Sequence, residues 1–567
     1  TLAKAKHRVL DLIGCAIGGR RPKKVALTTT LGGLNVKHGL RYKHSNNREN
    51  LGMAVDRRTF LGAPLAAGAA ASVLAGEAAA QAPAPSAKPV LKPGERLDAR
   101  SQKPAVATEA YAAYAANIKY SDIDAATLAK AKHRVLDLIG CAIGGAPAAG
   151  NAGLVDLVKV QGGAPEASVI GYKVKAPAAQ VAMTNAVISR AYDFEVMTVV
   201  VDGQQVASHH SPSTCMTALA LSEREHRSGK EFLAALVMGD DICARMLAAS
   251  GLDFGQGWDG APIYSSVGAA AISANLMRLT PLQAQDAFGL VVDTIAGTVQ
   301  NIWDGATDWK LPQGLAARNG VFAAELAKRG WVGVSDALRA PYGFFAQYTA
   351  GCAKPEVLTA KLGKAFWAEE YFKPYPACAA THATIECALA LRTNNKFAAG
   401  DVERWTISIA PAGLNVFVSK PFEARRYAHC DANFSHQWQA ANVLVNGSIR
   451  QEHYAEDAIR HPEVMNLVAK STLAALPAGQ TGFLIEAHMK DGRVLSQRHA
   501  GRPSHNPAEK GSSYEELVAK FRQQVAFSGF VSTRTANEII RRIDKLEEEP
   551  DMAGFVKLLT RTQFQQA

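Results

Sequence analysis

The chain has 567 residues, which is enough for two or more domains at about 150 residues each. Hydrophobic residues make up 48% and charged residues 20%, as in globular proteins with a large core, which excludes a disordered or fibrous chain. The net charge of +11 does not indicate a nucleic-acid partner, because residues 20–52 hold eight basic side chains and one acidic side chain and so carry +7 of it.

The first residues contain an unusual repeat. Residues 1–19, TLAKAKHRVLDLIGCAIGG, recur unchanged at 127–145, and the similarity stops there. Structural repeats diverge and recur at regular periods, so this copy does not indicate a repeat fold. Because the first copy runs into a basic, glycine-rich stretch without periodicity, we predict that residues 1–52 are a disordered basic extension.

An export signal follows the extension. The pair Arg57-Arg58 precedes a modestly apolar run at 63–76 and an Ala-Gln-Ala site at 80–82. This order is typical of a twin-arginine signal peptide, which we place at 53–82, and it predicts a periplasmic protein. The apolar run is shorter than the ~20 residues of a membrane-spanning helix, so we expect no stable membrane insertion. The Pro- and Ala-rich residues 83–104 then read as a linker.

Helical periodicity dominates residues 105–369. Apolar residues recur at helical spacing in segments that are separated by Gly and Pro, at 125–144, 178–189, 214–225, 230–250, 266–279, 281–299 and 314–329. Pairs of small residues inside several segments allow helices to approach closely. The pattern predicts a large helical domain.

The pattern of predicted secondary structure changes near Ala368. Strand-like runs occur at 404–410, 483–489 and 493–497, with helical segments at 381–392, 440–446 and 454–459 between them. We predict a small α/β domain from about Ala368 onward and, after it, helices that return to pack on the first domain. The predicted fold is therefore mostly α, with a large helical domain and an inserted, smaller α/β domain.

Candidate acid–base residues gather in one stretch of the helical domain. Asp193 and Glu195 precede the adjacent histidines His209 and His210. Imidazoles beside carboxylates suit proton transfer near neutral pH. A Ser-Pro-Ser turn at 211–213 then begins a helix whose N-terminus attracts anions. The alternative is a surface loop whose histidines only cap this helix.

Two further positions have the placement of site residues. Lys310 lies in a loop before the helix at 314–329, where it could reach the mouth of a site, although surface lysines are common there. Tyr264 precedes another Ala-rich helix. The eight cysteines have neither zinc-site nor disulfide spacing, and most read as core residues. Cys378 is the exception, since it lies in a rigid Pro-rich stretch before a helix that carries His382.

Several segments together resemble the MmgE/PrpD family, which includes 2-methylcitrate dehydratases, cis-aconitate decarboxylases and an iminodisuccinate epimerase. Each segment is weakly informative alone, but they occur in family order over residues 104–567. The matching segments are AYDFE at 191–195, HHSPS at 209–213, SGKEFLAALVMGDDICARM at 228–246, WKLPQGLAARNGVFAAELAKRGWVG at 309–333, APYGFF at 340–345, FKPYPACAATHA at 372–383, ANFSHQWQAANVLVNG at 432–447 and DGRVLSQRHAGRPSHNP at 491–507.

The resemblance implies a large all-helical domain that residues 505–567 complete and an inserted α/β lid domain at 370–504. It also implies a homodimer without a metal or cofactor and an active site between the helical domain and the lid domain. The family's motif aspartate falls on Asp193 and its histidine on His209, with His210 as the alternative. Its two site lysines fall on Lys310 and Lys373.

The chain departs from the family pattern at five places. Glu195 and Val196 replace the family's second acidic pair, and the gap from Asp193 to His209 is longer than in the family. The other three departures are Tyr264 where a histidine is expected, Cys378 in place of a lid histidine, and Trp438 in place of a tyrosine.

The residues and the resemblance together predict a metal-independent lyase that acts on a small di- or tricarboxylic acid by proton abstraction and elimination, as in 2-methylcitrate dehydratases. Asp193 would orient His209, which would move the proton. The expected substrate-binding residues are Tyr264, Arg318, Lys373, Cys378, His382 and Trp438, with Lys310 also holding a carboxylate. The alternatives are an epimerase or a decarboxylase on the same scaffold, and a non-catalytic periplasmic protein that binds an organic acid.

Overall fold

The computed structural model describes residues 99–101, 103–195, 198–201, 204–207, 209–251, 255–500 and 513–560. The predicted extension at 1–52, the predicted signal peptide at 53–82 and linker residues 83–98 lie outside the described residues. The chain divides into two compact units, and all described residues belong to the second, Ala66–Ala567.

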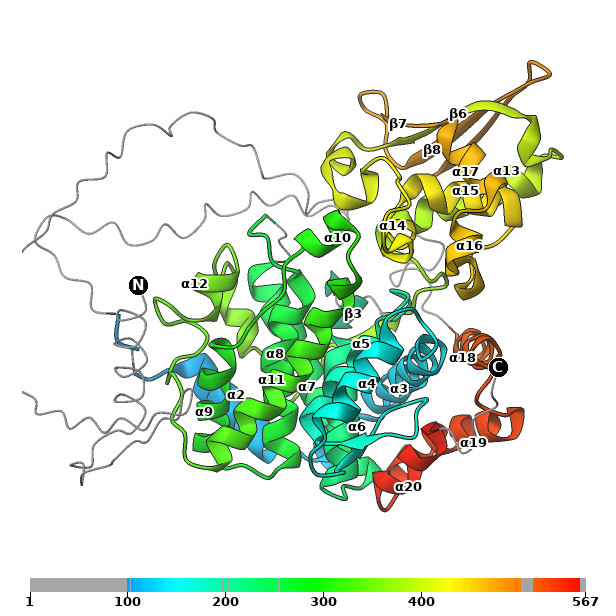
Figure 1. Ribbon diagram of the computed structural model, residues 1–567. Helices are drawn as coiled ribbons and strands as arrows, with labels where there is room; N and C mark the ends of the chain where they lie inside the picture. Colours follow the sequence, from blue (N-terminus) through cyan, green and yellow to red (C-terminus); the bar gives the residue numbers. More distant parts are fainter. Residues whose placement is uncertain are drawn as a thin grey trace, which may run out of the picture. The chain divides into compact units, whose positions relative to one another are not determined.

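The described residues are mostly helical, with strands only in small sheets, which confirms the predicted fold class (Figure 1). No helix among them combines the length and the apolar character needed to cross a bilayer. The helices of the helical domain before the lid domain are α2 (Val106–Asn117), α3 (Ala125–Gly145), α4 (Asn151–Gln161), α5 (Ala178–Ser189), α6 (Ser211–Arg224), α7 (Gly229–Ser250), α8 (Gly260–Leu276), α9 (Pro281–Val292), α10 (Gln300–Asp304), α11 (Leu311–Lys328) and α12 (Phe344–Tyr348), with short 3-10 turns η2 (Tyr120–Asp122), η3 (Thr307–Lys310) and η4 (Pro355–Leu358).

Helix α8 is the centre of this domain and is buried along nearly its whole length. It packs against α7, α9 and α11. A Cβ on Gly268 of α8 would lie 2.3 Å from the Cys243 sulfur of α7, so the two helices are too close for any larger residue. The helix predicted at 281–299 ends at Val292, because the chain turns there and Gly297 takes a left-handed φ of 126°.

Short strands also occur in the helical domain, which the sequence analysis did not predict. One pair is β1 (Ala167–Ser168) with β2 (Lys175–Ala176). The second sheet has the antiparallel order β4-β3-β5, with β3 (Thr198–Val201), β4 (Gln204–Ala207) and β5 (Ala368–Tyr371). The β3–β4 hairpin accounts for the long gap between Asp193 and His209. Its pairing with β5 joins this loop to the segment that enters the lid domain.

The segment predicted as the lid domain, for which we keep that name, contains a four-stranded sheet with helices packed against it. The strand order is β7-β6-β8-β9, in which only β6 and β7 run parallel. Its strands are β6 (Val402–Ile409), β7 (Ser471–Ala475), β8 (Phe483–Met489) and β9 (Val494–His499), and its helices are α13 (His382–Asn394), α14 (Ala428–Asn433), α15 (His436–Asn446), α16 (Glu456–Ile459) and α17 (Pro462–Ala469), with 3-10 turns η5 (Ala379–Thr381), η6 (Ala399–Asp401), η7 (Pro411–Asn415), η8 (Phe417–Ser419) and η9 (Gln451–Tyr454). A separate core that includes Trp405, Trp438 and Ile485 lies between the sheet and the helices.

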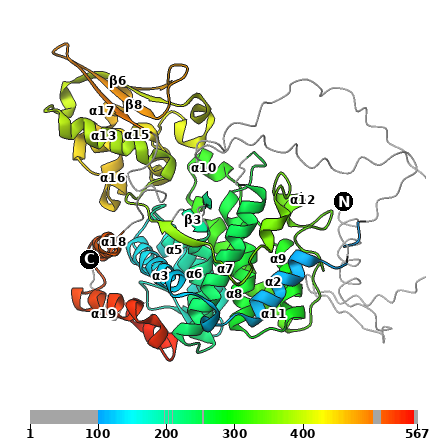
Figure 2. The ribbon, with the colours of Figure 1, turned by 180° about the vertical axis from the view of Figure 1, so that it is seen from behind.

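The chain returns to the helical domain after the lid domain, through α18 (Tyr514–Ser528), α19 (Thr533–Asp544) and α20 (Met552–Val556), with η10 (Leu546–Glu548) and η11 (Lys557–Leu559). Helix α18 packs on α3, and the two lie side by side in both views (Figures 1 and 2). Lys520 of α18 reaches inward, where Nζ lies 2.6 Å from Asp137 Oδ1 and donates to the Phe194 carbonyl at 2.6 Å. The C-terminal helices therefore support the loop that carries Asp193.

Candidate active site

The loop after α5 carries the first candidate site residues in an unusual conformation. Helix α5 ends at Ser189, and Asp193 takes a left-handed φ of 50°. A non-glycine residue is uncommon in this region, and such residues concentrate at functional sites. The conformation points the side chains of Asp193 and Glu195 into the protein, where both are buried.

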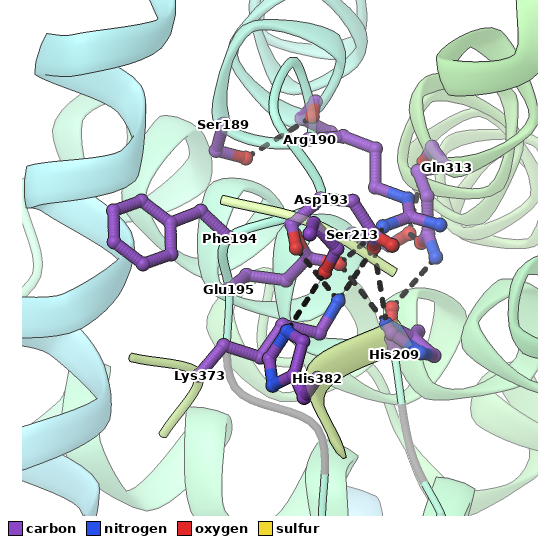
Figure 3. A network of polar contacts seen from close by, with 12 residues as sticks. Ser189, Arg190, Asp193, Phe194, Glu195, His209, Ser213, Gln313, Lys373 and His382 are labelled. Atoms are coloured by element: carbon purple, nitrogen blue, oxygen red, sulfur yellow. Dashed lines mark hydrogen bonds and ion pairs between the residues drawn. The ribbon is translucent and has the colours of Figure 1, made fainter. Parts of the chain in front are cut away.

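Four buried charges meet at this loop, and with His209 they form what we call the Asp193 cluster (Figure 3). Arg190 binds Asp193 and lies 2.6 Å from Glu195 Oε1. Lys373 Nζ lies 2.7 Å from Asp193 Oδ1 and also donates to the Asp193 carbonyl at 2.7 Å. Burial alone would raise the pKa of Glu195, but the charges of Arg190 and Lys373 hold it below its ordinary range. Two cations thus balance two carboxylates, which keeps the charges stable in the interior.

His209 is the member of this cluster that reaches solvent, with 21% of its side chain exposed. Its Nδ1 lies 3.1 Å from Glu195 Oε1 and 3.8 Å from Asp193 Oδ1. Because an ionised carboxylate only accepts, the ring proton is on Nδ1, and Nε2 has the lone pair. Burial and then the charge of Lys373 lower the pKa of His209, although the Glu195 hydrogen bond opposes this. The ring is therefore neutral at pH 7 and able to accept a proton.

Hydrogen bonds from α11 hold the backbone at His209. Gln313 Nε2 donates to the His209 carbonyl at 2.6 Å, and the Ser213 hydroxyl donates to the Gln313 carbonyl at 2.9 Å. Ser213 belongs to the first turn of α6, where Pro212 fits because a helix start needs no N–H there. The N-terminal turns of two helices therefore hold the backbone at His209 in place.

His210 lies apart from the Asp193 cluster. It is fully buried, and its Nε2 lies 3.3 Å from Asp240 Oδ1. Arg134 also forms an ion pair with the Asp240 carboxylate. Burial and the Arg134 charge lower its pKa well below the ordinary value. Of the two histidines left open by the sequence, the structure brings His209 to Asp193 and places His210 in a buried ion-pair network.

Lys310 forms a second polar centre at the start of α11. Its side chain is buried, and Nζ donates to the Ala149 carbonyl at 2.9 Å and to Asn151 Oδ1 at 2.7 Å. The ring of Tyr427, from the lid domain, lies 5.9 Å from Nζ. Burial lowers the pKa of Lys310 to about 7. Both hydrogen-bond partners are neutral, so among the described residues no carboxylate balances this cation.

Cys378 and His382 lie close to the Asp193 cluster. Burial raises the pKa of the Cys378 thiol to about 12, with the negative charge of Asp193 adding to the effect, so the thiol is not a nucleophile at neutral pH. His382 is fully buried at the start of α13, with Nε2 3.1 Å from the Ala377 carbonyl. Burial and the Lys373 charge lower the pKa of His382 to about 3, so this ring is neutral.

Three predicted substrate-binding residues bond elsewhere. Tyr264 is buried and its hydroxyl contacts Ser250 Oγ at 2.8 Å and the Gly251 carbonyl at 3.0 Å, at the end of α7. Arg318 donates to the neighbouring Asn319 at 3.2 Å. Trp438 is buried in the lid core, and its Nε1 donates to the Ile459 carbonyl at 3.2 Å. The structure does not bring these side chains to the Asp193 cluster.

Sequence reasoning missed four residues that shape the site. Arg190, Gln313 and Lys520 were not singled out, because their partners are distant in sequence or lie on a loop with no periodic pattern. The fourth is Asp259, a buried carboxylate before α8 whose Oδ2 has no hydrogen-bond partner among the described residues. Burial raises the pKa of Asp259 to about 6, and the charge of Arg190 opposes the rise.

The Asp193 cluster does not suit a divalent cation. Asp193, Glu195 and His209 each offer a ligand atom, and these atoms lie within 4.8 Å of one another. However, Arg190 and Lys373 both contact Asp193 Oδ1, and Arg190 also contacts Glu195. A metal ion would have to displace or face two buried positive charges, which is unfavourable at these distances.

Comparisons with known proteins agree with this architecture. The model of the MmgE/PrpD N-terminal domain matches residues 109–356, and that of the MmgE/PrpD C-terminal domain matches residues 375–547. A cis-aconitate decarboxylase-like protein, oryM, of Aspergillus oryzae is 26% identical over 475 residues, which cover 78% of this chain and 95% of the relative. The cis-aconitate decarboxylase of Mus musculus is 25% identical over 80% of this chain and 93% of its own length. That of Aspergillus terreus is 27% identical over 72% of this chain and 83% of its own length.

Proposed function

Because the chain belongs to the MmgE/PrpD family, we propose that it is a lyase that acts on a small di- or tricarboxylic acid. One observation carries the proposal above the others. His209 is a neutral imidazole, partly open to solvent, whose Nδ1 is fixed by Glu195 so that Nε2 is free to act as a base. Such an arrangement suits removal of a proton from the carbon next to a carboxylate.

The charged groups around His209 have separate roles in this proposal. When Nε2 takes the proton, the imidazolium lies against Glu195 and Asp193, which stabilise its charge. Lys373 is bound by both the carboxylate and the carbonyl of Asp193, so it positions this loop. Lys310 has only neutral partners and holds a substrate carboxylate.

Two reactions fit these roles. In dehydration, His209 removes a proton from carbon, the C–O bond breaks, and the imidazolium passes the proton to the departing hydroxyl, which leaves as water. In decarboxylation, a C–C bond breaks to release carbon dioxide, and the electron pair left on carbon takes a proton from His209 after solvent has protonated its Nε2. Decarboxylation is the second candidate reaction because the relatives are named as cis-aconitate decarboxylases or as similar to them.

A nuclear magnetic resonance assay in deuterium oxide tests the proposal. The full chain is incubated separately with 2-methylcitrate, citrate and cis-aconitate, and the products are followed by their carbon-bound protons. Loss of water gives a new alkene signal, decarboxylation gives a product one carbon shorter, and epimerisation gives deuterium at carbon in an otherwise intact acid. An unchanged spectrum for all acids, with no deuterium incorporation, contradicts an enzyme and favours an organic-acid-binding protein.

We also propose that the chain is exported and acts as a homodimer. The export proposal rests on the Arg57-Arg58 pair and the segment that follows it. Cell fractionation of the full chain should find it in the periplasm, and replacing both arginines with lysine should retain it in the cytoplasm.

The homodimer proposal rests on the family resemblance, and light scattering of the purified protein should give twice the mass of one chain.

A further inference from the structure

A histidine of the lid domain lies close to Lys310 and has no role in the reaction described above. His429, in α14, has 4% of its surface exposed. One ring nitrogen bonds to the backbone of Ala191, two residues before Asp193. The other, Nε2, has no hydrogen-bond partner among the described residues. A buried polar atom without a partner is unfavourable, so it points to a group that binds there.

Three tyrosine rings fix the orientation of this imidazole. The ring centroid of Tyr427 lies 5.6 Å away and is nearly parallel, at 11°. Those of Tyr454 and Tyr192 lie 5.0 Å and 4.8 Å away. The rings come from both the helical domain and the lid domain, so His429 is held at the boundary of the two and cannot turn Nε2 toward another partner.

The same boundary holds Lys310. The Ala149 carbonyl accepts from Lys310 Nζ at 2.9 Å and from the Tyr427 hydroxyl at 3.3 Å. Burial and then the Lys310 charge lower the pKa of His429 to about 3. We call Lys310, Asn151, Tyr427 and His429 the Lys310 cluster. It contains one cation without a carboxylate and one imidazole nitrogen without a donor.

We propose that Lys310 and His429 together form a subsite for one carboxylate of the substrate, in which His429 takes up a proton as the anion binds and then donates from Nε2 to a carboxylate oxygen. This inference takes its class of ligand, a di- or tricarboxylic acid, from the proposed function. His429, which would donate to the carboxylate, lies outside every motif that suggested the family.

Electrostatics explain why protonation and binding occur together. In the empty subsite the Lys310 charge and burial both oppose a charge on His429. A carboxylate beside Lys310 offsets that charge and supplies an acceptor for Nε2–H. The other titratable groups that face His429 are Tyr192, Tyr427 and Tyr454, and burial raises the pKa of each, so they stay neutral in this pH range.

Calorimetry with a non-reacting tricarboxylate, propane-1,2,3-tricarboxylate, tests the subsite on the full chain. Titrations at pH 7 in buffers of different ionisation enthalpy measure the protons taken up on binding. The wild type should take up about one proton, shared between Lys310 and His429. His429→Gln keeps a donor but cannot ionise, so it should lose part of the uptake and bind about tenfold more weakly.

A matched control is His436→Gln, since His436 is also buried in the lid domain but bonds to Thr384 at 2.8 Å. It should bind and take up protons as the wild type does. Should His429→Gln not fold, histidine Hε1–Cε1 resonances of the wild type are followed as the tricarboxylate is added. One buried imidazole should move from the neutral to the protonated position, and no movement overturns the subsite.

The outcomes separate this inference from the proposed function. If His429→Gln matches the wild type in affinity and proton uptake while the wild type converts an acid, the subsite is wrong and the lyase stands. If the wild type takes up protons on binding as expected and His429→Gln takes up fewer, but the wild type converts no acid, the subsite stands and the lyase is wrong. Absence of any binding by the wild type overturns the subsite.

Discussion

The Asp193 cluster and the Lys310 cluster differ in how their charges are balanced. In the Asp193 cluster two carboxylates face two cations, and the contacts that join them are 2.7 Å or shorter. In the Lys310 cluster the cation has neutral partners, and a buried imidazole nitrogen has none among the described residues. A balanced set of buried charges fixes geometry, whereas an unbalanced one attracts a ligand. One cluster therefore suits orientation of the base and the other suits binding of the acid.

The largest expected effect comes from removing the base. His209→Gln keeps the backbone contact to Gln313 but removes the basic Nε2, so kcat should fall by about 10²- to 10⁴-fold. The wild-type rate should fall in acid, as the imidazole is protonated, and the variant should lose this dependence. The control is His226→Gln, whose side chain is 72% exposed, and it should retain the wild-type rate. Turnover by His209→Gln close to that of the wild type would show that another group removes the proton.

The sequence could not choose between His209 and His210, because adjacent residues satisfy the same spacing. The choice depends on backbone geometry, since His209 follows the β3–β4 hairpin and His210 is the N-cap residue of α6. The hairpin itself was predictable, as an Asp-Gly pair, which the sequence has at 202–203, is a known hairpin turn pattern. The helices were easier, because a run of apolar residues at helical spacing placed α5 at its observed bounds.

The residues around the base were harder to predict, since their contacts are distant in sequence. Lys373 and Asp193 are 180 residues apart, and Lys520 and Phe194 are 326 apart. Periodicity and local motifs carry no information about such pairs. The same limit explains Trp438, whose alignment with a family tyrosine suggested a site residue, whereas its indole fills the lid core.

The next largest effect is on stability, from breaking the charge balance of the Asp193 cluster. Lys373→Met leaves Asp193 and Glu195 against Arg190 alone, so the free energy of unfolding should fall by about 3–5 kcal/mol. Chemical denaturation of the full chain measures this. Adding Asp193→Asn to the same chain removes the excess negative charge and should recover part of the loss. Equal stability of Lys373→Met and wild type would mean that water or a counter-ion compensates the carboxylates.

A smaller effect, with a defined pH dependence, is expected at Asp259. Its pKa is about 6 in the folded protein against 3.8 as the ordinary value, because burial disfavours its charge. The stability from proton binding is thus fully present below pH 3.8 and is lost as the pH rises through 6. Asp259→Asn removes this loss, so it should stabilise the protein at pH 8 by up to about 3 kcal/mol and have little effect at pH 4. Destabilisation at pH 8 would show that Arg190 needs this carboxylate.

The smallest effect separates the core of the lid domain from its site-facing edge. Trp438→Phe removes the hydrogen bond from Nε1 to the Ile459 carbonyl and some buried surface, so the free energy of unfolding should fall by about 1–2 kcal/mol. Trp438 lies in α15, whereas His429 lies in α14, the helix before it. As long as the substitution does not move α14, kcat/KM should change by less than about twofold. Thermal unfolding and steady-state rates on the same preparation measure both. A tenfold rise in KM with unchanged stability would instead make Trp438 a substrate-binding residue, as its alignment suggested.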